Sequence, residues 1–158
     1  MLSYIKILLF IPLVSFYSFA STINIDKSVV DANTTNKHIM LFLHKDNCGY
    51  CDRIEVNLSD INISKAIQKD FLLLDINRDG SDSIIYQDFN GTNRSFMKEL
   101  DINFYPTILF VDTKSDAIIY ALYGYMEVKE LLVELSYISS YAYTRISLEE
   151  YKGELFFD

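Results

Sequence analysis

Few residues in this chain interrupt or cross-link a fold. Its 158 residues include no tryptophan, two prolines, two cysteines and five glycines. The sequence contains no glycine-rich loop of the kind that holds phosphates, no internal repeat and no low-complexity tract. Basic residues are also scarce, with 14 Lys and Arg against 22 Asp and Glu, giving a net charge of −8. Since no basic block or stripe is present, a nucleic-acid partner held through its phosphates is not expected.

The residues that are present suit a packed domain. Half of the chain is hydrophobic and 15% is aromatic, which favours a single core over general disorder. A chain of 158 residues fits one domain. The 12 tyrosines and 11 phenylalanines are interpreted as core and shell packing rather than as a cofactor site, and no cofactor is expected.

The first 20 residues are typical of a targeting segment. Lys6 precedes an apolar run over residues 7–19, and Ser18-Phe19-Ala20 places small residues where a signal peptidase recognises them. The run is short for a membrane span, which needs about 20 apolar residues. We therefore predict a secretory signal over residues 1–20, with an uncleaved membrane anchor as the alternative. Export brings the two cysteines into an oxidising compartment.

The two cysteines form the motif Cys48-Gly49-Tyr50-Cys51. A chain that turns into a helix here places both sulfurs one turn apart at the helix N-terminus, where unpaired N–H groups and the helix dipole favour thiolate over thiol. Cysteine pKa values in such motifs fall to roughly 3.5–7.5, from about 8.5 for a free cysteine. The loop between the sulfurs is too short to stabilise a fold much by closure entropy, so a structural staple is the weaker interpretation. The spacing predicts redox chemistry.

Apolar patterns in the first half of the chain predict alternating helices and strands. Residues 21–37 are interpreted as a helical lead-in, and the apolar run 39–43 as a strand buried on both faces. A helix follows the cysteine motif. Ser64 is predicted to cap a short helix through Lys69, and residues 71–76 to form a second buried strand.

In the second half, the turn-rich residues 77–93 predict a loop before regular structure resumes. The complete order of strand, helix, strand, helix, strand, strand, helix implies an α/β fold with a mixed sheet, in which helical crossovers join parallel strands before an antiparallel hairpin. The remaining predicted elements are a helix over 94–101, hairpin strands over 107–111 and 117–123, a helix over 128–138, and a short helix capped by Ser147 and Glu150 that ends near Gly153.

Three segments together resemble the thioredoxin fold: residues 42–51 around the cysteines, Tyr105-Pro106-Thr107-Ile108-Leu109-Phe110, and Gly124-Tyr125. With the aromatic tail over 137–151, the sequence is most similar to exported bacterial thioredoxin-like proteins of the SoxW type. The resemblance covers roughly residues 28–151 and implies a three-layer sandwich, with helices on both faces of a mixed sheet, and a periplasmic location. The implied divisions are a lead-in at 21–37, a thioredoxin-like domain at 38–140 and a C-terminal tail with a short helix at 141–158.

The resemblance also implies roles for the site residues. The thiolate of Cys48 is expected to attack a substrate disulfide, and Cys51 to resolve the mixed disulfide that forms; the alternative is an incidental cysteine pair. Pro106 is expected to follow a cis peptide bond and to expose the backbone edge of Tyr105 to an extended substrate. The alternative is an ordinary proline at the start of a strand. The substrate-binding residues predicted in this way are Gly49, Tyr50, Tyr105 and Pro106.

The motif departs from many thioredoxins in ways that bear on proton transfer. They carry a buried carboxylate six residues before the first cysteine, where this chain has Phe42, and a tryptophan where it has Asn47. Glu55 follows the second cysteine by one helical turn. It is either a substitute proton acceptor or part of a solvated helix face, and the second interpretation is preferred.

Other charged and aromatic residues near the motif remain open to two interpretations. His44 and Lys45 are either cations that stabilise a thiolate or strand-end residues that face water, which is the preferred interpretation. Tyr50 either contacts substrate or only begins the helix. Asp75 and Asp79 flank a polar turn and have no obvious partner in the sequence.

The predicted activity is thiol:disulfide exchange by an exported enzyme that acts as a reductase. Disulfide-bearing exported proteins are the expected substrates, a membrane electron relay is the expected donor, and the protein is expected to be a monomer. Oxidase action is the nearest alternative, and isomerase action is less favoured. Cu(I) binding by the two thiolates and an inert binding scaffold are alternatives of other classes. No metal site is assigned, because structural zinc needs four ligands and only His44 lies nearby.

Overall fold

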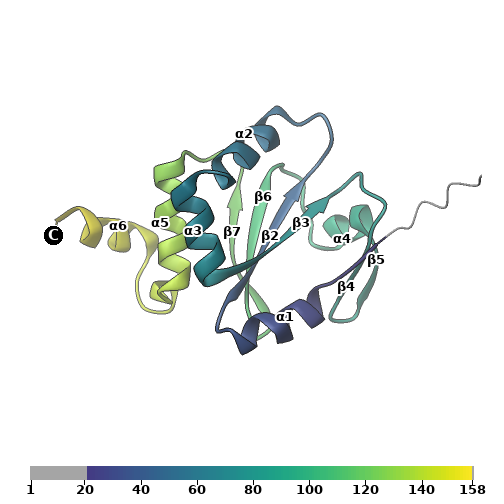
Figure 1. Ribbon diagram of the computed structural model, residues 1–158, viewed down its shortest axis with the longest axis horizontal. Helices are drawn as coiled ribbons and strands as arrows, with labels where there is room; N and C mark the ends of the chain where they lie inside the picture. Colours follow the sequence, from purple (N-terminus) through teal and green to yellow (C-terminus); the bar gives the residue numbers. More distant parts are fainter. Residues whose placement is uncertain (1–20, 158) are drawn as a thin grey trace, which may run out of the picture.

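The computed structural model describes residues 21–157, so the predicted signal segment lies outside the described residues. Helices and strands are interspersed along this part of the chain (Figure 1). None of the helices in it is long and apolar enough to cross a lipid bilayer. The elements are β1 (Thr22–Asn24), α1 (Ile25–Thr34), β2 (His38–His44), α2 (Gly49–Leu58), α3 (Ile61–Asp70), β3 (Phe71–Asn77), β4 (Ser83–Tyr86), β5 (Phe89–Thr92), α4 (Asn93–Glu99), β6 (Thr107–Asp112), β7 (Ala117–Tyr123), α5 (Val128–Ser139), the short 3-10 helix η1 (Ala142–Thr144) and α6 (Leu148–Phe157).

A four-stranded mixed sheet forms the centre of the domain, in the order β3-β2-β6-β7. β2 is parallel to β3, because α2 and α3 carry the chain back between them, and antiparallel to β6. β6 and β7 form the predicted hairpin. Nearly all of β2 is buried, as expected for a continuous apolar run. β3 is correctly placed by the sequence, but it is only partly buried because it lies at the edge of the sheet.

Alternate side chains of β2 point into two hydrophobic cores, one on each face of the sheet. Met40 and Phe42 pack with residues of α2, α3 and α5, whereas Ile39, Leu41 and Leu43 pack with residues of α1 and α4. Figure 1 shows α3 and α5 on one side of the central strands and α1 and α4 on the other. The structure is therefore the expected three-layer α/β sandwich with helices on both faces.

A second sheet of three strands lies beside α4, in the order β1-β4-β5 (Figure 1). The predicted loop over residues 77–93 is wrong, since this segment contains the β4–β5 hairpin. Only Ile84 and Tyr86 of β4 are buried, and β5 has the sequence Phe-Asn-Gly-Thr, with a single large apolar residue. Four-residue strands of this composition carry too little apolar alternation to outweigh the turn residues around them.

Two predicted helix boundaries are also wrong. α3 begins directly after Asp60, whose carboxylate accepts hydrogen bonds from two backbone N–H groups of the first turn, so Ser64 lies inside the helix. α6 continues past Gly153. The predicted capping box at its start is confirmed: the N–H of Ser147 donates to the Glu150 carboxylate at 2.8 Å, and the Glu150 N–H donates to the Ser147 hydroxyl at 3.3 Å.

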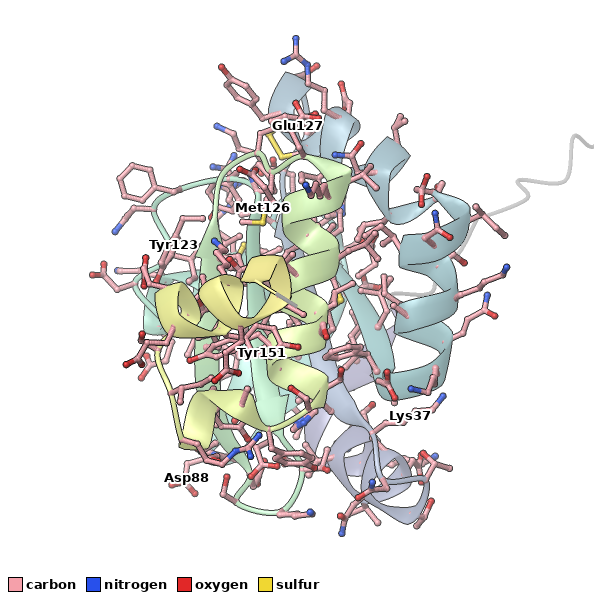
Figure 2. The ribbon with its side chains drawn as sticks, turned by 90° about the vertical axis from the view of Figure 1, so that its left-hand side faces the viewer. Lys37, Asp88, Tyr123, Met126, Glu127 and Tyr151 are labelled. Atoms are coloured by element: carbon pink, nitrogen blue, oxygen red, sulfur yellow. A yellow bond between two sulfur atoms is a disulfide. The ribbon has the colours of Figure 1, made fainter. Side chains whose placement is uncertain are left out.

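The C-terminal tail packs against α5 through tyrosines. Figure 2 shows Tyr151 of α6 directed towards α5, where its hydroxyl lies 2.6 Å from the Ser136 hydroxyl. Its ring centroid is 5.3 Å from that of Tyr137. Tyr137 is buried and donates a hydrogen bond to the carbonyl of Ile146 at 2.7 Å. These contacts join the tail to the core on this face of the sheet.

Candidate active site

The two cysteines form a disulfide at the N-terminus of α2. Cys48 is the N-cap residue, and its Sγ accepts a hydrogen bond from the N–H of Cys51 at 3.3 Å. Figure 2 shows the disulfide at the end of the molecule where Met126 and Glu127 lead into α5. Cys48 keeps 8% of its surface exposed, compared with 1% for Cys51. A molecule in solution therefore reaches Cys48 more readily, whereas Cys51 is enclosed by the protein.

A sharp turn after β2 brings the chain to the disulfide. Asn47 has a φ of 54°, in the left-handed region that asparagine adopts more readily than most residues. Asp46 is fixed beside it by the side-chain amide of Asn77 at 2.7 Å, and its N–H donates to Asp79 at 3.2 Å. The asparagine that stands where many thioredoxins have tryptophan is thus a turn residue in this chain.

The Tyr105–Pro106 segment lies at the same end of the sheet as the disulfide. The peptide bond between these two residues is cis. Thr107 of β6 pairs with Leu43 of β2, so the residues before Thr107 flank the point where β2 leads towards the cysteine motif. The carbonyl of Pro106 accepts a hydrogen bond from the N–H of Gly124 at 2.8 Å, which ties this segment to the end of β7.

Contacts on several sides hold the ring of Tyr105. Its hydroxyl donates to the carbonyl of Ile102 at 3.3 Å. The Lys45 ammonium and the Arg78 guanidinium lie 5.6 Å and 5.5 Å from the ring centroid. Burial raises the pKa of Tyr105, while Arg78 acts in the opposite direction. Lys45 is therefore a cation–π partner of Tyr105, a role that neither interpretation of the sequence included.

His44 lies between carboxylates on β3 and α2. Its Nε2 is 2.7 Å from the Asp75 carboxylate, and its Nδ1 is 3.8 Å from the Glu55 carboxylate. Its ring stacks on Phe42 with centroids 4.9 Å apart. Phe42 is fully buried, so an apolar ring fills the position where many thioredoxins carry a carboxylate. The preferred interpretation of His44 as a residue facing water is wrong, because only 13% of its side chain is exposed.

The acidic residues near the turn have partners that the sequence did not indicate. Asp75 pairs with His44 across neighbouring strands, and Asp79 pairs with Arg78 and Arg94. Burial acts to raise the pKa of Asp79, but the hydrogen bonds from Arg78 and from a backbone N–H lower it overall. Glu55 remains 51% exposed on α2, in agreement with the solvated-face interpretation.

A shallow hollow next to the disulfide is lined by Gly49, Tyr50 and Arg53. Tyr50 is 58% exposed, so it presents an aromatic surface two residues from the more exposed cysteine. Sequence reasoning places Gly49 and Tyr50 here but does not single out Arg53. The available signal is the four-residue spacing from Gly49 to Arg53, which puts both on one side of α2.

The geometry suits a two-step exchange of sulfur bonds. After reduction, the N–H of Cys51 is in place to stabilise a Cys48 thiolate, and the two sulfurs are close enough to re-form their bond. No group of three or more His, Cys, Asp and Glu side chains that could hold a metal ion occurs within residues 21–157. The arrangement of the cysteine pair offers thiol–disulfide exchange.

A disulfide at the start of the helix that follows the central strand, in a three-layer sandwich of this topology, defines a thiol:disulfide oxidoreductase with a thioredoxin fold. The chain belongs to the thioredoxin-like domain family, whose model matches residues 25–139. No curated protein matches the chain in sequence.

Several solved structures share this fold. A thioredoxin-fold protein from Helicobacter pylori is similar with a TM-score of 0.68 and 21% identity, over 85% of this chain and 88% of that chain. A thioredoxin from Thermus thermophilus has a TM-score of 0.58 and 19% identity, over 75% and 86% of the two chains. A disulphide isomerase from Xylella fastidiosa Temecula1 has a TM-score of 0.57 and 16% identity, over 73% and 88%. At these identities the similarity establishes the fold.

Proposed function

We propose that the protein is an exported, periplasmic thiol:disulfide reductase of the SoxW type, acting on disulfides of other exported proteins. The observation that carries the proposal is a disulfide between two unequally buried cysteines, since 8% of the surface of Cys48 is exposed and 1% of that of Cys51. The more accessible sulfur acts as nucleophile, and the enclosed sulfur resolves the intermediate. The signal-like sequence over residues 1–20 supports export.

In the proposed cycle the reduced protein supplies two electrons to the substrate. The Cys48 thiolate attacks one sulfur of the substrate disulfide, forming a mixed disulfide and releasing the other sulfur as a thiolate that takes up a proton. Cys51 then loses its proton and attacks the Cys48 sulfur, which releases the second substrate thiolate and restores the internal disulfide. A membrane electron relay returns two electrons to that disulfide.

The surface around Cys48 is proposed to hold an extended polypeptide. The Tyr105–Pro106 segment precedes β6 at the sheet end that carries the disulfide, and Gly49 and Tyr50 line the neighbouring hollow. An exposed aromatic ring next to the nucleophile suits a partner of variable sequence, because it contributes contact area without demanding a particular hydrogen-bond pattern.

Insulin reduction with dithiothreitol as the electron source tests the exchange activity. We expect C48S to abolish the catalysed rate. The matched variant C51S leaves the nucleophile in place and is expected to accumulate a mixed disulfide with substrate, visible as a gel band that disappears on reduction. Full activity of C48S would refute the role given to this residue.

The reduction potential of the disulfide tests the proposed direction. Equilibration with defined ratios of reduced and oxidised dithiothreitol or glutathione measures this quantity. A value near about −250 mV supports a reductase, whereas a value near about −120 mV supports an oxidase instead. Fractionation of the producing cells, with N-terminal sequencing of the protein, tests the periplasmic location and the cut after Ala20.

A further inference from the structure

Arg53 is a cation in the first half of α2, the helix that begins at the cysteine pair. It lies on α2 and lines the hollow next to Gly49 and Tyr50. Its guanidinium carbon is 5.6 Å from the ring centroid of Tyr50 and 5.8 Å from that of Tyr125, and the two centroids are 6.4 Å apart. Tyr50 belongs to α2 and Tyr125 to the connection between β7 and α5, so two separate segments hold the guanidinium through cation–π contacts.

The charge of Arg53 is not neutralised by any ion pair within the described part of the chain. By contrast, Arg78 and Arg94 both pair with Asp79. A guanidinium that is held by cation–π contacts still has N–H groups to donate, and their planar fork matches the two oxygens of a carboxylate. Arg53 is therefore arranged to bind a carboxylate from outside the molecule.

We propose that Arg53 is a specificity-determining residue that binds a carboxylate next to the substrate disulfide that Cys48 attacks. This inference rests on the proposed function, because it assigns a substrate preference to the same site. It adds no chemical step: Cys48 still bonds to one substrate sulfur as the substrate disulfide breaks, and Arg53 exchanges neither a proton nor an electron. The net charge of −8 repels acidic substrates at long range, so this local cation offsets that repulsion at the point of contact.

Two kinds of substrate carry a carboxylate in this position. One is a polypeptide with Asp or Glu beside its disulfide-bonded cysteine. The other is a small disulfide with carboxylates of its own, such as oxidised glutathione. Both present the same group to the guanidinium, so the test includes one arm for each source.

Single-turnover reduction of matched peptides tests the preference. The full-length protein, reduced beforehand and freed of reductant, is mixed with three disulfide peptides that differ only in having Glu, Gln or Lys after the cysteine. We expect the second-order rate constant to be about two- to fivefold higher for the Glu peptide than for the Gln peptide, and lowest for the Lys peptide, as is typical of one exposed charge pair.

Three variants show whether Arg53 causes the preference. R53Q is expected to remove it, and R53K to keep only part of it, because lysine lacks the planar donor fork. K27Q removes the same charge from an exposed residue of α1, which covers the other face of the sheet, and is expected to keep the full preference. Circular dichroism of each variant checks that the fold is intact.

The small-molecule arm compares oxidised glutathione with the uncharged 2-hydroxyethyl disulfide. A loss of the glutathione preference in R53Q, with unchanged peptide ratios, identifies the small disulfide as the carboxylate source. Unchanged ratios for both peptides and small disulfides in R53Q overturn the proposal and leave the proposed function intact. Failure of the wild-type protein to reduce any of these substrates refutes the proposed function itself.

Discussion

Gly124 joins the Pro106 segment to the end of β7 in a backbone conformation that suits glycine. Its φ is +81°, and its N–H donates to the Pro106 carbonyl at 2.8 Å. A Cβ added to Gly124 would meet no atom within 4 Å, so alanine would add backbone strain without a steric clash. That strain is about 1–2 kcal/mol. We therefore expect G124A to lower the Tm by about 3–7 °C for a chain of this size.

Gly153 provides a matched control for this prediction. A Cβ added there also meets no atom within 4 Å, but Gly153 lies in α6 and has no positive φ. Alanine in a helix is favoured over glycine by about 0.5–1 kcal/mol, so G153A is expected to raise the Tm by about 2–3 °C. Both substitutions add one methyl group in open space, and the compared difference is the backbone conformation of the substituted residue.

Calorimetry of the oxidised wild-type protein and of both variants, at one pH and one scan rate, measures these shifts. Insulin reduction by the G124A variant adds a functional measurement. The hydrogen bond between Gly124 and Pro106 means that a backbone shift at residue 124 also moves the Pro106 segment next to the site. A Tm for G124A at or above the wild-type value would refute the argument from backbone conformation. Equal shifts of the same sign in G124A and G153A would refute it as well.

Three further substitutions test buried polar groups. Burial lowers the pKa of His38, against the opposing effect of Asp112. The wild-type protein should therefore lose stability as the pH falls below about 6.5. H38F should reduce the change in the urea midpoint between pH 7 and pH 5. Burial raises the pKa of Glu134, so stability should fall as the pH rises above the ordinary pKa of 4.5. E134Q should remove this decrease when the urea midpoint is measured against pH. Y137F loses the hydrogen bond to Ile146 and should lower the Tm by about 3 °C, which calorimetry measures.

The features that were predicted correctly from the sequence depend on residues close together in the chain. The apolar run 39–43 predicts a strand buried on both faces, and the spacing of apolar residues over 128–138 predicts a helix. The Cys48-Gly49-Tyr50-Cys51 motif predicts a sulfur pair at a helix start, and the structure places the disulfide there. In each case, local periodicity or a local motif decides the conformation.

The features that were missed depend on segments distant in the chain. The distant partners of Asp75 and Asp79 are His44 on a neighbouring strand and Arg94 on α4, and no spacing in the sequence indicates that these residues will be adjacent. β4 forms within a turn-rich segment by pairing with β5 and with β1, which lies about 60 residues earlier. One of the two rings that contact Arg53 belongs to Tyr125, which a separate loop supplies.

The residue that caps α2 is also the residue that changes in the reaction. Asn24, Asp60 and Thr92 cap their helices with an oxygen, whereas Cys48 uses sulfur. Reduction replaces a disulfide sulfur with a thiolate, which is a stronger acceptor, so the two oxidation states differ in folding free energy. By a thermodynamic cycle, a difference of about 1.4 kcal/mol in folding free energy between the two oxidation states changes the reduction potential by about 30 mV relative to that of the unfolded chain. Urea titrations of the oxidised and reduced forms therefore measure, without an electrode, how much folding shifts the reduction potential of this disulfide.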